Sequence, residues 1–325
     1  MPSRPLITLV VPVFNERDNL VQFHDAVTEV MRSIGEYDWE FVFIDDGSRD
    51  GSFEALRALR SRDERVMAAR FPRNFGSHIA IAAGIDHCRG DAAIIMAADL
   101  QDPPAIIRDF IDRWQSGFDV VWGARTGRDE GMIRSWGMSL FYALVRRFAI
   151  PSYPKGGTGS FCLISRPVID AFRQCTERNR LTFGLVAWSG FRETEVPYHR
   201  PRRLVGSSSW TVGRMLKAAI DTFVSFSFLP IRAISLLGLV VSFTSFVFGF
   251  YLLVNRAVFG RPLEGWTSVM LAVLVLGGVQ LVMIGVLGEY LWRILDEARG
   301  RPLYIVERTL GLSTASVAAP IGTPS

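Results

Sequence analysis

The chain has 325 residues, of which 49% are hydrophobic and 21% are charged, and its mean hydropathy is +0.22. That length allows one large domain or two ordinary ones, and the hydrophobicity is high for a wholly soluble enzyme, so we expect part of the chain to lie in lipid. Three cysteines without a CxxC spacing argue against a disulfide framework or a zinc site and favour a reducing compartment. The net charge of +4 suits an anionic membrane surface or phosphate-bearing substrates, and we expect no nucleic-acid partner.

The N-terminal part, from Leu6 to about Ala124, alternates short apolar runs with helical stretches. Such alternation is typical of βαβ units and predicts an α/β fold, with a mostly parallel, twisted sheet that carries helices on both faces. The first strand begins almost at once, which leaves no room for a secretory signal peptide. The expected strands are 7–14, 39–45, 66–71 and 92–98, and the expected helices are 18–34, 52–62 and 76–88.

Polar side chains follow three of these strands at the point where each strand ends. Asn15 and Glu16 follow the first strand, residues 45–48 follow the second, and residues 99–102 follow the fourth. Because ligands of parallel sheets bind at the carboxyl ends of the strands, we expect these residues to converge on one rim. The alternative is that Asp45 and Asp46 are turn and cap residues, since Asp-Gly-Ser is a common turn sequence.

The middle of the chain, roughly residues 120–206, is less regular and is expected to form short strands and loops that complete a site. A basic, aromatic run at 134–147 indicates a helix with arginines on one side. The glycine-rich run at 151–161 is either a flexible loop or one that closes over a ligand. Residues 211–232 predict an amphipathic helix that can lie on a membrane surface.

Two long apolar stretches follow, Ile234 to Val254 and Ser268 to Leu287, and neither contains Lys, Arg, Asp or Glu. About 20 such residues span the hydrocarbon core of a bilayer, whereas the alternative, a pair of buried core helices, is disfavoured by the length and the lack of charge. Basic residues flank the pair more densely than they occupy the connecting loop, so both ends are placed in the cytoplasm. The expected organisation is a cytoplasmic catalytic domain at 1–210, a juxtamembrane helix at 211–232, two transmembrane helices within 233–290, and a cytoplasmic tail at 291–325 whose last residues are disordered.

Carboxylates and a glutamine at strand ends, with no cysteine or histidine at ligand spacing, favour a hard divalent cation, Mg²⁺ or Mn²⁺. Such a cation usually binds together with an anionic ligand, and a diphosphate is one. The sequence contains neither a GxxxxGK[ST] loop nor a GxGxxG fingerprint, so neither a P-loop phosphotransferase nor a dinucleotide oxidoreductase is supported. We therefore expect the acidic residues after the second strand to bind the base or ribose of a nucleotide.

Five motifs stand in one order along the chain: VPVFNE at 11–16, DDGS at 45–48, RNFG at 73–76, ADLQDPP at 98–104 and RRLVGSSSW at 202–210. In this order and spacing the chain resembles family 2 glycosyltransferases, and more narrowly the polyprenyl-phosphate glycosyltransferases, the bacterial relatives of dolichol-phosphate mannose synthase. The resemblance covers Leu6 to about Arg301. It implies a Rossmann-like GT-A domain followed by two membrane helices in the inner (cytoplasmic) membrane.

The resemblance also implies an activity, the inverting transfer of one sugar from a UDP- or GDP-linked donor to a polyprenyl phosphate, such as undecaprenyl phosphate, at the cytoplasmic face. It implies Mg²⁺ or Mn²⁺ as the cofactor and is compatible with a homo-oligomer. The site residues it implies are Pro12, Val13, Glu16 and Asp46, with Asp45 and Ser48 of the same motif, for the nucleotide; Asp99 and Gln101 for the metal on the diphosphate; Arg125 and Arg134 for donor or acceptor phosphates; and Arg203 and Ser208 for the phosphate near the membrane.

Two positions depart from the family pattern. That pattern usually reads DADLQDPP, so Ala97 replaces its first aspartate, and the family commonly has an aspartate where Gly157 stands. The first change reduces the metal site without removing Asp99 and Gln101. The second removes a residue often proposed as a general base. A lipid phosphate is already anionic at neutral pH, so it needs a base less than a sugar hydroxyl does. In-line placement of the phosphate oxygen behind the anomeric carbon can then be sufficient.

Two rival functions remain open. A processive polysaccharide synthase shares the implied fold, but the QxxRW motif and the additional spans of such enzymes are missing from the sequence. A non-catalytic nucleotide-sugar sensor or membrane scaffold is favoured by Ala97 and Gly157. Metal-dependent nucleotide binding, with or without turnover, discriminates the sensor from the enzyme.

Overall fold

The structure is a computed structural model that describes residues 4–126, 142–147, 150, 153, 161–177, 181–199, 229–259 and 265–312. The chain divides into two compact units, one made of residues 1–212 together with 302–325, and the other of residues 213–301. Several predicted features lie outside the described residues: Arg134, Gly157, Arg203, Ser208, the amphipathic segment 211–228 and the chain from 313 onward.

The first unit contains all the described strands. They are β1 (Leu6–Val13), β2 (Asp38–Asp45), β3 (Val66–Arg70), β4 (Ala92–Ile95), β5 (Val120–Thr126), β6 (Cys162–Ser165), β7 (Glu193–His199) and β8 (Arg308–Leu310). Its helices are α1 (Arg17–Ser33), α2 (Ser52–Arg62), α3 (Ser77–His87), α4 (Ile106–Gln115), α6 (Arg166–Gln174) and α7 (Thr182–Trp188). The strands and helices predicted before residue 98 are confirmed, with ends that differ by a few residues at most.

The strands form one sheet in the order β7-β5-β6-β4-β1-β2-β3-β8. Its centre, β4-β1-β2-β3, is parallel throughout, and β5 and β7 are parallel to each other. Antiparallel pairs join β6 to β4 and β5, and join β8 to β3. The predicted α/β class with a mostly parallel sheet is confirmed.

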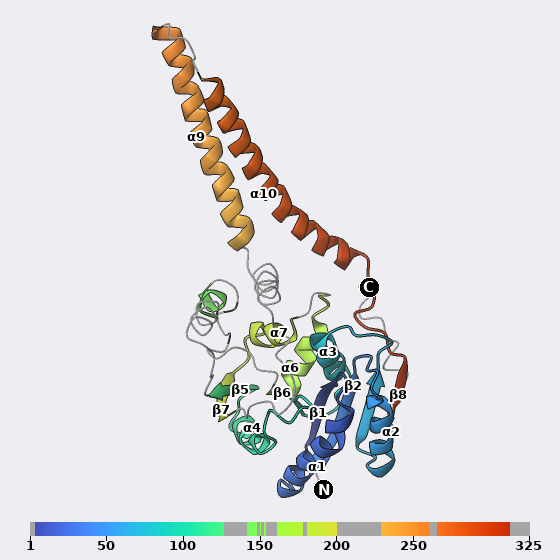
Figure 1. Cartoon of the computed structure of the whole chain (residues 1–325). Helices are drawn as coiled ribbons and strands as arrows, with labels where there is room; N and C mark the ends of the chain where they lie inside the picture. The colour runs from blue at the N-terminus through green and yellow to red at the C-terminus, as the bar shows by residue number, and fades with distance from the viewer. Residues whose placement is uncertain are drawn as a thin grey trace, which may run out of the picture. The chain divides into compact units, whose positions relative to one another are not determined.

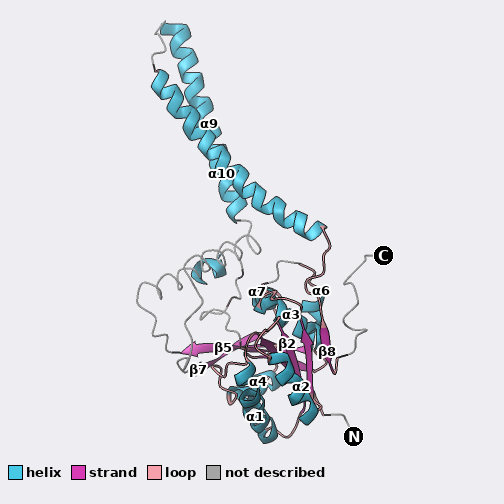
Figure 2. Ribbon diagram, turned by 45° about the vertical axis from the view of Figure 1, so that its right-hand side comes forward, coloured by secondary structure: helices cyan, strands magenta, loops and turns pink. Residues whose placement is uncertain are grey.

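Helices cover both faces of the sheet, as Figures 1 and 2 show: α1, α2 and α4 lie on one face, and α3, α6 and α7 lie on the other. Successive side chains of a strand point to opposite faces, so Phe41 and Phe43 pack toward α1 and α2, while Val42 and Ile44 pack toward α3. Strands buried on both faces read as continuous apolar runs, which is why the central strands are recognisable from the sequence.

The C-terminal segment contributes a strand that the sequence analysis did not predict. Arg308–Leu310 pairs antiparallel with Ala68–Arg70 and forms the edge of the sheet beside β3. Three residues are too few to show a two-residue period, so the pattern of the tail gave no sign of a strand. Residues 302–312 therefore belong with the α/β unit rather than with a separate tail.

A buried polar network joins β1, β2 and the turn after α3 near the amino ends of the strands. Glu40, which is 3% exposed, accepts a hydrogen bond from Thr8 Oγ1 at 2.6 Å and from the backbone and guanidinium of Arg89 at 2.7 to 2.9 Å. The Gly90 backbone N–H donates to Thr8 Oγ1 at 2.9 Å. The buried carboxylate is thus satisfied on both oxygens, as a buried charge must be.

Glu40→Ala is expected to lower the free energy of unfolding by about 2–4 kcal/mol, because it leaves buried donors of Thr8 and Arg89 without their acceptor. The exposed guanidinium of Arg89 regains water, which keeps the cost below that of a fully buried ion pair. Thermal unfolding of the detergent-solubilised protein should show a midpoint lower by about 5–15 °C. Glu36→Ala, in the exposed turn before β2, is the control, and equal midpoints for the two variants would contradict the stabilising role.

The second unit contains α9 (Leu229–Phe259) and α10 (Trp266–Ala298), which pack side by side, with Gly238 against Met283. Each contains a stretch long and apolar enough to cross a membrane, Ile231–Tyr251 and Val275–Ala298, and no residue in the most apolar part of either stretch is buried inside the protein. Large side chains such as Phe246 and Leu281 are more than 70% exposed. Exposed apolar helices of this length fit a bilayer, and they argue against the alternative of buried core helices.

Candidate functional site

The carboxyl edge of the parallel strands contains a topological switch point. The chain proceeds from β1 to β2 and β3 on one side, and then returns to place β4 on the other side of β1. Ligands of open α/β sheets bind in the crevice outside the strand ends at such a point. The loops that follow β1, β2 and β4 are therefore the candidate site.

Hydrogen bonds join the loop after β1 to the loop after β2. Asp45, the fully buried last residue of β2, accepts a hydrogen bond from the Ser48 backbone N–H at 2.9 Å. Ser48 Oγ accepts from the Asn15 backbone N–H at 2.9 Å, and Asn15 Oδ1 accepts from the Arg49 backbone N–H at 3.0 Å. Asn15 has a φ of 56°, in the left-handed region that Asn tolerates better than most residues. The structure thus brings two of the predicted clusters together.

Asp46 ties the second loop to the RNFG motif. Its two carboxylate oxygens accept hydrogen bonds from the backbone N–H groups of Phe75, at 2.6 Å, and Gly76, at 2.9 Å. Gly47, which follows Asp46 in the same loop, has a φ of +72°. A Cβ at this position would lie 2.5 Å from the Arg73 carbonyl carbon, so only glycine fits. Asp46 therefore positions the 73–76 loop, in addition to the nucleotide role predicted for it.

Burial raises the pKa of the Asp45 and Asp46 carboxyls above the ordinary value, and hydrogen bonds from Ser48, Phe75 and Gly76 offset only part of that increase. A raised pKa means that the native state holds the proton more tightly than the unfolded chain does. The resulting stabilisation is present below the ordinary carboxyl pKa of about 4 and is lost as pH rises through the raised value. Ionisation of these two carboxyls is therefore a cost to the fold, which is typical of functional sites.

Asp45→Asn is accordingly expected to keep or raise the midpoint of thermal unfolding at pH 7, because it removes a buried charge while retaining an acceptor for Ser48. The same variant should bind nucleotide more weakly if Asp45 contributes to that site. Differential scanning fluorimetry and nucleotide titration check the two effects. A midpoint lower by several degrees would show that the charge stabilises the fold.

The loop after β4 carries the residues predicted to hold a metal. Asp99 is half-buried, and its Oδ1 accepts a hydrogen bond from the Gln101 backbone N–H at 3.2 Å. Leu100 between them has a φ of 55°, a left-handed conformation that is costly for a side chain of this kind. Such strain concentrates at functional sites, where the surrounding structure enforces it. The turn follows β4, which pairs with β1 in the parallel part of the sheet.

Asp102, on this loop, and Tyr198, on β7, connect the loop to Arg125 near the end of β5. The Tyr198 hydroxyl donates a hydrogen bond to Asp102, and both side chains are buried. Arg125 Nε donates to the Tyr198 oxygen at 3.3 Å from the neighbouring position on β5. Burial, together with the nearby Asp102 carboxylate, raises the pKa of Tyr198 to about 12, so the phenol remains a donor at physiological pH.

Tyr198 is a residue that the sequence analysis missed. The alternating pattern of Glu193–His199 directs Val196 and Tyr198 inward, and a buried tyrosine usually has a hydrogen-bond partner. That signal points to a buried hydroxyl but not to Asp102, which is distant in the sequence. The structure adds Tyr198 and Asp102 to the candidate site and links them to the predicted Arg125.

The donor set fits a divalent cation that arrives with a phosphate ligand. Within the described parts of the chain, no three His, Cys, Asp or Glu side chains gather as a metal cluster. Mg²⁺ is usually held by one or two carboxylates plus substrate phosphates, rather than by an all-protein cage. In such an arrangement Asp99 would supply one carboxylate and Gln101 a neighbouring amide oxygen.

The predicted nucleotide residues at the start of the chain lie beside the fastened loops. Pro12 and Val13 end β1, and the Glu16 backbone N–H donates to Ser52 Oγ at 3.1 Å. The Glu16 carboxylate accepts a hydrogen bond from Asn19 Nδ2 at 2.5 Å. Glu16 therefore lies against the start of α2, next to the loop that contains Asp45, Asp46 and Ser48.

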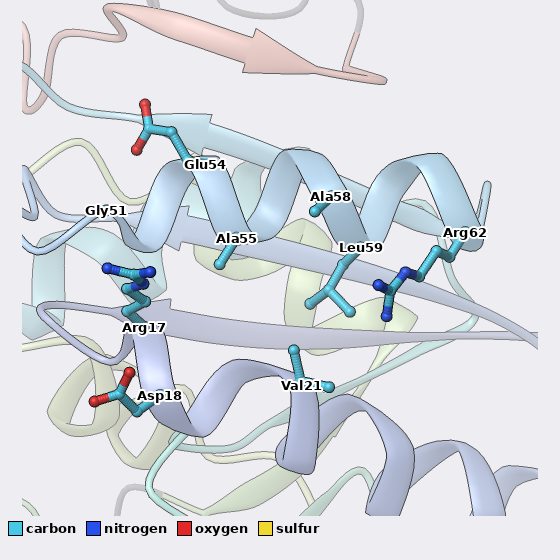
Figure 3. Close-up of a pocket in the computed structure, with 9 residues that line it drawn as sticks. All are labelled: Arg17, Asp18, Val21, Gly51, Glu54, Ala55, Ala58, Leu59 and Arg62. Carbon is cyan, nitrogen blue, oxygen red and sulfur yellow. The ribbon is translucent and has the colours of Figure 1, made fainter.

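A separate groove of about 640 Å³ lies between α1 and α2 (Figure 3). Its lining includes Arg17 and Arg62 as well as Asp18 and Glu54, so positive and negative charges balance. None of the loop residues 99–102 lines it. The groove therefore gives no indication of an anionic ligand, and the candidate site remains the strand edge.

The comparisons with known proteins identify the family. The family described as glycosyl transferase family 2 matches residues 8–172. An uncharacterised glycosyltransferase of Bacillus subtilis is 38% identical over 306 residues, which cover 94% of this chain and 94% of that protein. A bactoprenol glucosyl transferase of Shigella phage SfII is 38% identical over 304 residues, which cover 93% of this chain and 98% of that protein.

Among solved structures, a mannosyltransferase from Pyrobaculum calidifontis, in complex with GDP-Man and Mn²⁺, matches with a TM-score of 0.47 at 17% identity, over 69% of this chain and 64% of that one. Mannosyl-3-phosphoglycerate synthase from Rubrobacter xylanophilus matches with a TM-score of 0.49 at 14% identity, over 67% of this chain and 71% of that one. The family match and the near full-length relatives carry the assignment: the chain belongs to glycosyl transferase family 2 and is a glycosyltransferase.

Proposed function

We propose that this glycosyltransferase moves one sugar, with inversion, from a nucleotide diphosphate sugar to a polyprenyl phosphate at the cytoplasmic face of a membrane. The observation that carries the proposal is the near full-length similarity to a bactoprenol glucosyl transferase, since bactoprenol is a polyprenyl alcohol. The two exposed apolar helices α9 and α10 support it, because a lipid acceptor requires an enzyme at the bilayer.

The donor nucleotide is proposed to bind at the loops after β1 and β2. The residues proposed for this role lie on or next to the two loops, which hydrogen bonds join: Pro12, Val13, Glu16, Asp45, Asp46 and Ser48. Their hydrogen bonds fix the backbone before a ligand arrives, and such preorganisation reduces the entropy lost on binding. A UDP- or GDP-linked sugar matches this position at the switch point of the sheet.

The diphosphate of the donor is proposed to lie at the loop after β4. Asp99 and Gln101 would hold Mg²⁺ or Mn²⁺ there, and the bound cation would neutralise charge that develops on the diphosphate. Arg125, positioned by Tyr198, would contact a donor or acceptor phosphate, for which its planar fork of donors is suited. Arg134 is proposed to act with Arg125, and Arg203 and Ser208 to hold the acceptor phosphate; all three lie outside the described residues.

In the proposed reaction an oxygen of the lipid phosphate attacks the anomeric carbon of the sugar. The bond from that carbon to the diphosphate oxygen breaks, and the nucleoside diphosphate leaves with the electron pair. The acceptor oxygen is already anionic at neutral pH, so no side chain has to remove a proton. This agrees with glycine at position 157. The protein would contribute mainly in-line placement of the two reactants.

The test is product formation by the purified, detergent-solubilised protein given undecaprenyl phosphate, Mg²⁺ or Mn²⁺, and a panel of UDP- and GDP-sugars. The expected result is a sugar–phosphate lipid from one donor, with the anomeric configuration opposite to that of the donor. Omission of the lipid is the control for donor hydrolysis. If no donor reacts while nucleotide still binds with metal, the chain is a nucleotide-sugar sensor or scaffold.

A further inference from the structure

The segment that follows α10 reaches the carboxyl edge of β3, where the sequence analysis placed no functional residue. Tyr304 stacks on Phe71 with ring centroids 5.2 Å apart, and its hydroxyl donates to Asp86 Oδ2 at 3.2 Å. The Glu307 backbone N–H donates to the Arg70 carbonyl at 2.7 Å. Together with the β8–β3 pairing, these contacts hold residues 302–312 in a defined place on the α/β unit.

The segment contacts the side chain of Arg70, the last residue of β3, through Glu307. Its guanidinium donates a hydrogen bond to the Ser48 carbonyl at 3.1 Å and lies over the Phe53 ring at 5.7 Å. Its Nε lies 3.8 Å from Asp45 Oδ2 and 3.5 Å from Glu307 Oε2. One guanidinium thus contacts both ends of the Asp45–Ser48 loop from one side and Glu307 from the other.

The Nε atom of Arg70 makes no hydrogen bond in either of its two ion pairs. Asp45 Oδ2 and Arg70 Nε are both buried, and neither has a hydrogen-bond partner among the described residues. The orientation of the guanidinium therefore depends on the Ser48 carbonyl, the Phe53 ring and the two carboxylates that face it, rather than on a rigid bidentate pair. Of these two carboxylates, that of Glu307 is 38% exposed and comes from the C-terminal segment, while that of Asp45 is fully buried.

We propose that Glu307 is a positioning residue of the donor site, which orients Arg70 and through it the Asp45–Ser48 loop. In this proposal the segment 302–312 contributes to the nucleotide site by orienting Arg70, and it is not an independent tail. The effect on nucleotide affinity rests on the proposed function, whereas the effect on the loop does not. A purely structural surface pair would contribute little and would leave the loop unchanged.

The experiment compares Glu307→Gln, Glu307→Asp and the control Glu64→Gln in the full-length, detergent-solubilised protein. Glu64 is an exposed glutamate at the opposite end of β3, so its substitution removes the same charge from the same strand region. Hydrogen–deuterium exchange is measured on peptides that cover residues 45–52 and 38–44 without ligand. We expect several-fold faster exchange at 45–52 in Glu307→Gln alone, with 38–44 unchanged and Glu307→Asp intermediate.

Nucleotide affinity and kinetics provide the second readout. Titration with UDP and with GDP in the presence of Mn²⁺ should give a Kd about 3- to 10-fold higher for Glu307→Gln than for Glu64→Gln, and the donor KM should rise by a similar factor with kcat nearly unchanged. If exchange at residues 45–52 is equally fast in Glu307→Gln and in Glu64→Gln, the proposal is overturned. If the unaltered protein binds neither nucleotide, the proposed function fails, and the exchange result alone decides the positioning role.

Discussion

Asp99→Asn is expected to reduce sugar transfer by about 10²- to 10³-fold, since it removes the one carboxylate of the pair that we propose binds the metal. The structure gives Asp99 a half-buried position in a strained turn, with Gln101 as its neighbour. Loss of a bound cation removes several kcal/mol of charge stabilisation at the diphosphate, and each 1.4 kcal/mol corresponds to a factor of about ten in rate. Because Ala97 offers no second carboxylate, the proposed metal site depends more on Asp99.

The measurement is the rate of sugar transfer at saturating donor, together with nucleotide affinity at increasing Mn²⁺ concentration. Asparagine keeps the shape of the side chain and an acceptor for the Gln101 N–H, so a folding defect is not expected. Asp109→Asn, at an exposed position on α4, is the matched control. Unchanged turnover in Asp99→Asn would overturn the metal assignment, and nucleotide binding that keeps its full dependence on Mn²⁺ in this variant would show that other residues hold the cation.

The sheet and the polar rim were predictable because their signals are local. A parallel strand covered on both faces reads as one apolar run, and residues that interrupt it, such as Asp45 and Asp99, mark the end where ligands bind. The long apolar helices were predictable for the same reason, since spanning length and lack of charge are properties of a single segment. These signals require no knowledge of which strand lies beside which.

The connections within the site were not predictable, because each joins residues far apart in the chain. Tyr198 bonds Asp102 across 96 positions of sequence, and Glu307 faces Arg70 only because a three-residue strand adds to the edge of the sheet. Asp46 is a further case, since the DDGS motif indicates an acidic site but not that its carboxylate holds the backbone of Phe75 and Gly76. The sequence therefore identifies candidate groups, while the fold decides which of them support the others.

Tyr198→Phe is expected to lower kcat by about 10- to 100-fold while leaving the fold intact. The ring packs edge-to-face on Phe161, with centroids 5.7 Å apart, and phenylalanine preserves that contact. The lost hydroxyl is the link between Asp102, on the loop that carries Asp99 and Gln101, and Arg125, on β5. Loss of a buried hydrogen-bonding group costs about 1–3 kcal/mol, and we expect that cost to fall on the placement of the two elements proposed to bind phosphate.

Two comparisons separate this positioning role from a general loss of stability. Tyr37→Phe removes another buried phenolic oxygen, which accepts a hydrogen bond from Gln115, and should leave kcat unchanged. Asp102→Asn keeps an acceptor for the Tyr198 hydroxyl and should be less impaired than Tyr198→Phe. A kcat for Tyr198→Phe equal to that of Tyr37→Phe would show that the hydroxyl does not position the site.

The pH dependence of Tyr198→Phe gives an independent check on the state of the phenol. Because burial and Asp102 raise the pKa of Tyr198 to about 12, the native state holds this proton more tightly than the unfolded chain, whose tyrosines titrate near pH 10. The corresponding stabilisation is complete below about pH 10 and is lost as pH rises through 12. The pH–rate profiles of the unaltered protein and Tyr198→Phe should therefore run parallel up to about pH 10, displaced only in height. An alkaline limb near pH 10 that disappears in Tyr198→Phe would show instead that the phenol ionises during turnover and acts by more than holding Asp102 and Arg125 in place.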